Sequence, residues 1–105
     1  GEDLKLDVGT AFDLTAKRVQ TSYVTSRDTT GGRRRTVATA DYRVTLTNAG
    51  EDPVTVDVLE QRGGEWSILS SSTRAEKLSS TRTRFRVTVP AKGEAKLTYR
   101  VRVVW

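Results

Sequence analysis

The chain has 105 residues, which suits one domain, and its 18 Lys and Arg outnumber 13 Asp and Glu to give a net charge of +5. Because it contains neither Cys nor His, disulfides, thiolate metal sites and catalysis by histidine are excluded. No apolar run approaches the roughly 20 residues of a membrane-spanning helix. We therefore expect no cofactor, no metal and no transmembrane segment in this chain.

Apolar and polar residues alternate with a period of two along nearly the whole chain, which predicts β-strands. Residues 1–10 alternate weakly, and we expect an extended N-terminal arm or the remnant of a tag, since the chain begins with Gly. In residues 11–26 the apolar phase slips between Ala16 and Val19, which predicts a β-bulge or two short strands. Residues 27–36 hold a Gly-Gly pair among polar residues and are predicted to form a loop.

The second part of the chain repeats a pattern of strand and turn. The further predicted strands are residues 37–48, 54–60, 66–70, 83–89 and 95–105. Trp66 and Ile68 share one phase, which points both side chains inward. The polar stretch 71–80 is predicted to be a loop, with Leu78 as its only sizeable apolar anchor. The final strand is the most regular, so we expect it to span the full core and to be required for folding.

Six or seven short strands, with turns about every 8 to 14 residues, are typical of a β-sandwich or barrel. We predict an all-β fold over residues 11–105, a sandwich or barrel of about seven mostly antiparallel strands. The chain starts with Gly and lacks Met, so we expect it to be a piece of a larger protein.

Four segments in this order carry a family resemblance: "VGTAFDLTAKRVQTSY", "VTLTNAGEDPVTVDVLE", "GGEWSILSSS" and "EKLSSTRTRFRVTVPAKGEAKLTYRVRVVW". Together they resemble the C-terminal end of a bacterial family of uncharacterised domains, sometimes labelled mucoidy-inhibitor-like. The resemblance covers residues 8–105. It departs from the family pattern at "RDTTGGRRRT", where a short variable linker is expected, so that loop inherits nothing from it.

The resemblance implies an immunoglobulin-like sandwich that ends the protein at Trp105. It also implies a bacterial protein that is exported, which places the chain in the periplasm, the cell envelope or the secreted fraction. No activity is established for the family, so no catalytic residue carries over from it.

The candidates for catalysis in this sequence are weak. Four serines gather near one strand end, namely Ser67, Ser70, Ser71 and Ser72. They lack the G-x-S-x-G turn and a histidine base, which indicates a strand end and a polar loop. Asp7 and Asp13 bracket a glycine, but a calcium loop needs more converging oxygens than this pair supplies.

Paired carboxylates could catalyse acid–base chemistry on sugars. The candidate pairs are Asp57 with Glu60 and Glu51 with Asp52. Glu51 and Asp52 lie in a predicted turn, where acidic residues are common turn formers. Asp57 alternates with valines and is predicted to face solvent. We therefore predict that the chain is not an enzyme.

Arginines form the strongest constellation and define a possible anion-binding set: Arg82, Arg84, Arg86, Arg100, Arg102, Arg33, Arg34 and Arg35. If residues 90–94 closed a hairpin, Arg84 would face Arg100, and like charges opposite each other destabilise a ladder. If the two strands belong to different sheets, this clash vanishes. The aromatic residues mostly follow the apolar phase, which predicts that they form the core and argues against stacking on single-stranded nucleic acid.

We expect a non-catalytic structural or protein-interaction module of an exported envelope protein. Its partners would be other domains of the parent protein or another envelope protein. The alternative is a polyanion-binding module that uses the arginines against acidic glycan, lipid headgroup or nucleic acid; it is not favoured, because charge runs usually face solvent. An accessory domain of a hydrolase is a distant third.

Overall fold

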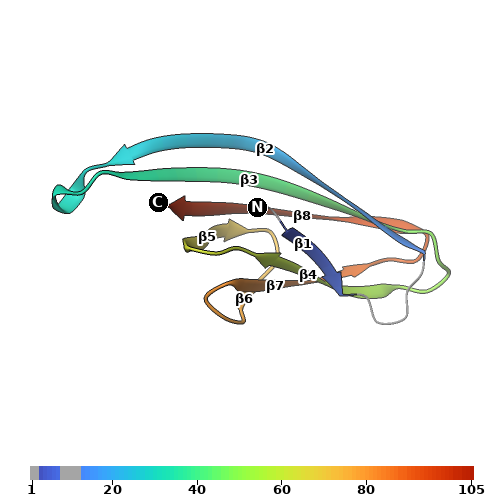
Figure 1. Cartoon of the computed structure of the whole chain (residues 1–105). Helices are drawn as coiled ribbons and strands as arrows, with labels where there is room; N and C mark the ends of the chain where they lie inside the picture. The colour runs from blue at the N-terminus through green and yellow to red at the C-terminus, as the bar shows by residue number, and fades with distance from the viewer. Residues whose placement is uncertain (1–2, 8–12) are drawn as a thin grey trace.

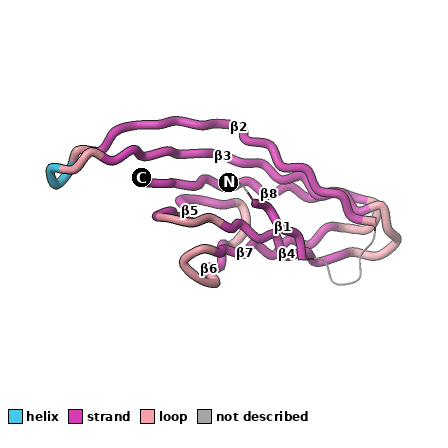
Figure 2. The backbone as a smooth tube through the Cα atoms, viewed as in Figure 1, coloured by secondary structure: helices cyan, strands magenta, loops and turns pink. Residues whose placement is uncertain are grey.

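The structure is a computed structural model that describes residues 3–7 and 13–105. Within these ranges the chain forms eight β-strands and one short 3-10 turn, η1 (Thr30–Gly32), and contains no α-helix (Figures 1 and 2). No helix in this part of the chain is long and apolar enough to cross a membrane. The prediction of an all-β chain is confirmed.

The strands form two antiparallel sheets. Sheet A has the order β1-β4-β7-β6, with β1 (Asp3–Asp7), β4 (Val54–Gln61), β7 (Arg82–Val89) and β6 (Ala75–Lys77). Sheet B has the order β2-β3-β8-β5, with β2 (Leu14–Asp28), β3 (Arg35–Asn48), β8 (Gly93–Val104) and β5 (Glu65–Ser71). Strand β1 lies within the arm expected over residues 1–10, and it pairs with β4.

The core lies between the two sheets, because β3, β4, β7 and β8 each bury one apolar face. Sheet A contributes Val56, Val58 and Phe85, all of them fully buried. Sheet B contributes, among others, Leu97 and Tyr99. The rings of Phe85 and Tyr99 stack across the interface with their centroids 4.8 Å apart. Each buried side chain of this size contributes roughly 1.5–3 kcal/mol before entropy costs.

Strand β2 is one continuous strand with a bulge, and not two short strands. The bulge lies between Gln20 and Ser22, a few residues beyond the phase slip in the sequence. The predicted loop over residues 27–36 is shorter than expected, because β2 continues to Asp28 and β3 begins at Arg35. The tip turns on Gly31 and Gly32, whose φ angles of 75° and 76° favour glycine.

The polar stretch 71–80 was predicted wrongly in two respects. It contains a short edge strand, β6, and Leu78 is exposed and does not anchor it. Trp66 is half-buried against the core, while its indole Nε1 donates to the carbonyl of Ser80 at 3.0 Å. Short strands that pair with only one neighbour leave little periodicity in the sequence, so β6 could not be recognised there.

The last strand is central, as its regular alternation predicts. Strand β8 pairs with β3 on one side and with β5 on the other. Trp105 extends this pairing, since its backbone N–H donates to the carbonyl of Thr36 at 2.9 Å and its carbonyl accepts from the N–H of Thr36 at 2.7 Å. The β2–β3 hairpin continues past the end of sheet A, and its tip projects from the sandwich (Figure 1). The molecule is accordingly elongated, with extents of 57 × 25 × 21 Å.

Candidate functional site

A carboxylate lies in the middle of the core. Glu60 follows Val56 and Val58 at two-residue steps on β4, so the alternation of the strand turns its side chain inward. Glu60 is 0% exposed. A buried carboxylate is costly unless it is paired and hydrogen-bonded, so its partners decide whether it is tolerated.

Three side chains satisfy Glu60. Tyr99 donates its hydroxyl to Oε2 at 2.5 Å. Arg62 donates from Nε to Oε1 at 3.1 Å, and Arg18 donates from Nη2 to Oε1 at 3.2 Å. Because Arg18 lies on β2 and Tyr99 on β8, these bonds join Glu60 of sheet A to two strands of sheet B.

Tyr42 completes this arrangement, which we call the inner cluster (Arg18, Tyr42, Glu60, Arg62 and Tyr99). The guanidinium of Arg18 lies over the Tyr42 ring, 3.9 Å from its centroid, and Nη2 of Arg62 donates to the Tyr42 hydroxyl at 2.7 Å. Burial, followed by the charge of Glu60, raises the pKa of the Tyr99 phenol well above its usual range. Tyr99 therefore stays protonated and remains a donor.

The hydrogen bonds of the inner cluster connect sheet A to sheet B and oppose sliding of one sheet over the other. The side chains of Arg18 and Arg62 are only 11% and 13% exposed, so solvent screens these ion pairs little. Removal of one partner from a buried pair leaves an uncompensated charge.

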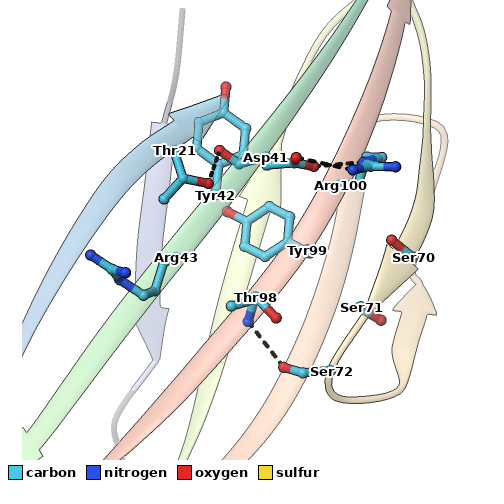
Figure 3. A pocket seen from close by; sticks show the side chains of 10 residues that line it. All are labelled: Thr21, Asp41, Tyr42, Arg43, Ser70, Ser71, Ser72, Thr98, Tyr99 and Arg100. Atoms are coloured by element: carbon cyan, nitrogen blue, oxygen red, sulfur yellow. Dashed lines mark hydrogen bonds and ion pairs between the residues drawn. The ribbon is translucent and has the colours of Figure 1, made fainter. Parts of the chain in front are cut away.

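A second polar arrangement lies on the outward face of sheet B, directly behind the tyrosines. We call it the outer hollow; its volume is about 620 Å³, and Figure 3 shows the ten residues that line it. Hydroxyl and charged side chains dominate its outward-facing part, chiefly Thr21, Asp41, Arg43, Ser70, Thr98 and Arg100. It falls within the size range of small-ligand pockets, roughly 300–1,000 Å³.

Two β-bulges lie beside the outer hollow, one in each edge strand of sheet B. Ser22, Asp41, Arg100 and Ser70 lie side by side across four strands, in one row. The bulge in β2 falls between Gln20 and Ser22, next to this row, and a second bulge in β5 falls between Ile68 and Ser70. Bulges bend a strand and redirect its side chains, so the sheet is distorted at the same level on both edges.

An ion pair fixes one wall of the outer hollow. Arg100 donates from Nε to Asp41 Oδ1 at 2.7 Å and from Nη2 to Oδ2 at 3.1 Å, a bidentate geometry. This hydrogen bond lowers the pKa of the Asp41 carboxyl and raises the pKa of Arg100. Arg43 lies in the neighbouring row opposite Thr98, and it forms no ion pair with any residue that the structure describes.

The arginines singled out from the sequence do not form one surface. Arg82, Arg84 and Arg86 lie on β7 in sheet A, whereas Arg100 and Arg102 lie on β8 in sheet B. Arg84 does not face Arg100, so the like-charge opposition does not arise.

Carboxylates neutralise several of these arginines. Arg84 pairs with Glu76 at 2.7 Å, and Arg86 pairs with Asp57 at 3.0 Å. The hydrogen bond from Arg84 lowers the pKa of Glu76. Arg35, at the hairpin, pairs with Glu65 at 2.8 Å. Within the described part of the chain, the members of the set that form no ion pair are Arg33, Arg34, Arg82 and Arg102.

The carboxylate pairs considered for catalysis do not converge. Asp57 and Glu60 lie on opposite faces of β4, since the first pairs with surface arginines and the second is buried. In the turn after β3, Glu51 pairs with Lys92, and the Asp52 carbonyl accepts a bond from Asn48. Residues 3–7 and 13–105 contain no group of three carboxylates that could hold a metal. Asp7 belongs to β1, and its side chain is outside what the structure describes.

The serines lie where the sequence suggested, at the end of β5 and in the following turn. Ser70, Ser71 and Ser72 line the outer hollow, and Ser67 lies outside it. Ser71 donates to the Thr73 carbonyl, and Ser72 accepts from the Thr98 N–H at 3.0 Å. These bonds shape the turn that follows β5.

Sequence reasoning missed the residues that matter most here. Glu60 was considered only as one half of a catalytic pair with Asp57, although its two-residue spacing from Val58 already indicated the core face. Arg18, Arg43 and Arg62 were not singled out at all. Arg18 bonds to Glu60 and Arg62 bonds to Tyr42, which lie 42 and 20 residues away in the chain, so the sequence did not show these contacts.

Comparison with known proteins adds no assignment: no family model, no curated protein and no solved structure matches the chain.

Proposed function

We propose that this domain is a non-catalytic module that acts by binding another protein or another domain of its parent protein. The contact element is the β2–β3 hairpin. The observations that carry the proposal are the projection of this hairpin beyond sheet A (Figure 1) and two exposed aromatic side chains on the core-facing phase of sheet B, Tyr23 and Trp105.

The two exposed aromatic side chains lie on the same phase of their strands as the core residues of sheet B. Tyr23 pairs in register with Ala40 and is 53% exposed, while Trp105 pairs with Thr36 and is 60% exposed. In the sandwich proper, the same phase of the strands is covered by sheet A. Aromatic side chains of this kind are enriched in protein interfaces.

The setting that we propose follows from the resemblance described above. It is the C-terminal, immunoglobulin-like module of an exported bacterial protein, in the periplasm, the envelope or the medium. Two antiparallel sheets with a shared core support the sandwich part of this proposal.

A photocrosslinking amino acid at position 23 of the parent protein tests the role of the hairpin in the cells that produce it. Position 55 is the matched control, because Thr55 is exposed in a strand on the outward face of sheet A. We expect a discrete protein adduct, or a crosslink to another domain of the parent, from position 23 and none from position 55. Equal labelling from both positions, or none from either, would refute the proposal.

A folding control accompanies this experiment. Tyr23→Ser should change the free energy of unfolding by less than about 0.5 kcal/mol, as is usual for an exposed position. When Trp105 carries the crosslinker, Tyr23→Ser should weaken the adduct while the melting transition stays unchanged.

A further inference from the structure

The outer hollow combines an oriented guanidinium, an unpaired guanidinium and a row of hydroxyls. Arg100 is held by Asp41 in a bidentate pair, so its direction is fixed. Arg43 is exposed on the adjacent strand, one row away, and diagonal neighbours in a sheet lie about 7–8 Å apart. Two arginines and one aspartate leave the hollow with an excess of one positive charge.

The outward side chains next to these charges are short. Thr98 and Ser70 leave room over the sheet, and Thr21 lies at the bulged edge (Figure 3). Thr21 donates to the Asp41 carbonyl at 3.3 Å, which orients its hydroxyl. A ligand in this hollow would meet hydroxyls on its floor and guanidinium groups at two sides, so it should be rich in hydroxyls and should carry a negative charge.

The outward faces of β3 and β8, both described in full, contain no aromatic side chain. Proteins that bind single-stranded nucleic acid stack bases on aromatic rings, and that platform is missing. The planar guanidinium fork matches both carboxylate and phosphate in a bidentate geometry, and the DNA duplex in the test below distinguishes the two.

We propose that the outer hollow binds a short oligosaccharide that carries carboxylates, a uronate. In this site Arg43 pairs with the uronate carboxylate, Arg100 donates its remaining N–H groups, and Thr98 and Ser70 bond to sugar hydroxyls. The proposal narrows polyanion binding to one face of sheet B. It does not depend on the hairpin contact proposed above.

Titration of the 105-residue chain with tetragalacturonate, followed by amide NMR and calorimetry, tests this site. The matched probes are maltotetraose, which has the same length without charge, and a short DNA duplex. We expect tetragalacturonate to shift the amides around Asp41, Ser70 and Thr98, and maltotetraose to bind at least tenfold more weakly. No binding of tetragalacturonate, or equal binding of maltotetraose, would overturn the proposal.

Two variants and one control locate the binding. Arg43→Gln should weaken tetragalacturonate at least tenfold, and Ser70→Leu, which fills the floor of the hollow, should do the same. Arg86→Gln is the control, because Arg86, like Arg43, is an exposed arginine on a strand but lies on sheet A, away from the hollow. Equal loss in Arg43→Gln and Arg86→Gln would show general charge attraction and refute a dedicated site. Tighter binding of the duplex at the same amides would assign the hollow to nucleic acid instead and would also refute the proposal.

Discussion

The inner cluster and the outer hollow use the same chemistry on opposite faces of the same two strands. Tyr42 and Tyr99 belong to the inner cluster, and their chain neighbours Asp41 and Arg100 form the ion pair of the outer hollow. One residue along the strand thus separates a buried ionic network from a surface pair. The difference in solvent, and not in bond geometry, should decide what each contributes to stability.

Because the inner cluster is desolvated, we expect substitutions in it to destabilise the fold strongly. A charge that loses its partner inside the core cannot be rehydrated, whereas a charge at the surface returns to water. We therefore expect the free energy of unfolding to depend steeply on the inner cluster and weakly on the outer pair. The outer pair is then free to serve recognition.

The largest effect is expected for Glu60→Gln. This change removes the carboxylate charge that pairs with Arg18 and Arg62 in the core, so it should lower the free energy of unfolding by about 3–5 kcal/mol. Urea unfolding followed by tryptophan fluorescence measures the effect. Asp57→Asn is the control, since Asp57 lies on the same strand but pairs with arginines at the surface. If both substitutions lower the free energy of unfolding by the same amount, burial does not explain the contribution of Glu60 to stability.

Tyr99→Phe should have the next largest effect, about 1–3 kcal/mol, because a buried carboxylate oxygen loses its donor. Tyr23→Phe is the control and should cost less than about 0.5 kcal/mol, as its side chain is exposed. A double-mutant cycle of Tyr99→Phe with Glu60→Gln should show that the two losses are not additive. Full additivity would mean that the Tyr99–Glu60 bond contributes nothing of its own.

Asp41→Asn should lower the free energy of unfolding far less than Glu60→Gln, because ion pairs at the surface contribute little to stability. The same variant leaves Arg100 without its fixed orientation, so it should alter uronate binding more than it alters stability. Chemical unfolding and calorimetry on one preparation compare the two effects. A stability loss as large as that of Glu60→Gln would contradict the comparison.

The smallest effect concerns pH. Arginine partners lower the pKa values of Asp41 and Glu76 below their ordinary 3.8 and 4.5. Each pair therefore stabilises the fold above the unfolded-state pKa, and this contribution is lost as pH falls through the folded-state pKa. Between about pH 6 and pH 3, the free energy of unfolding should fall less steeply with decreasing pH in Asp41→Asn than in the parent chain. Identical slopes would show that the Arg100 pair does not contribute.

The sequence by itself determined the strands and their faces. Alternation of apolar side chains identified six of the eight described strands and the spanning length of β8, because period two is a local property of an extended backbone. Its phase slip indicated an irregularity in β2, a bulge or a break, a few residues before the bulge that the structure shows. The same alternation placed Asp57 outward, and its phase also points Glu60 inward.

Tertiary structure decided which strands became neighbours. The separation of β7 from β8 into different sheets, the overhang of the β2–β3 hairpin and the partners of Glu60 all depend on contacts between residues far apart in the chain. Side-chain spacing along one strand cannot encode them, since pairing between distant strands is settled by the packing of both apolar faces at once. The outer hollow arises in the same way, where bulges on two separate strands meet at one row of the sheet.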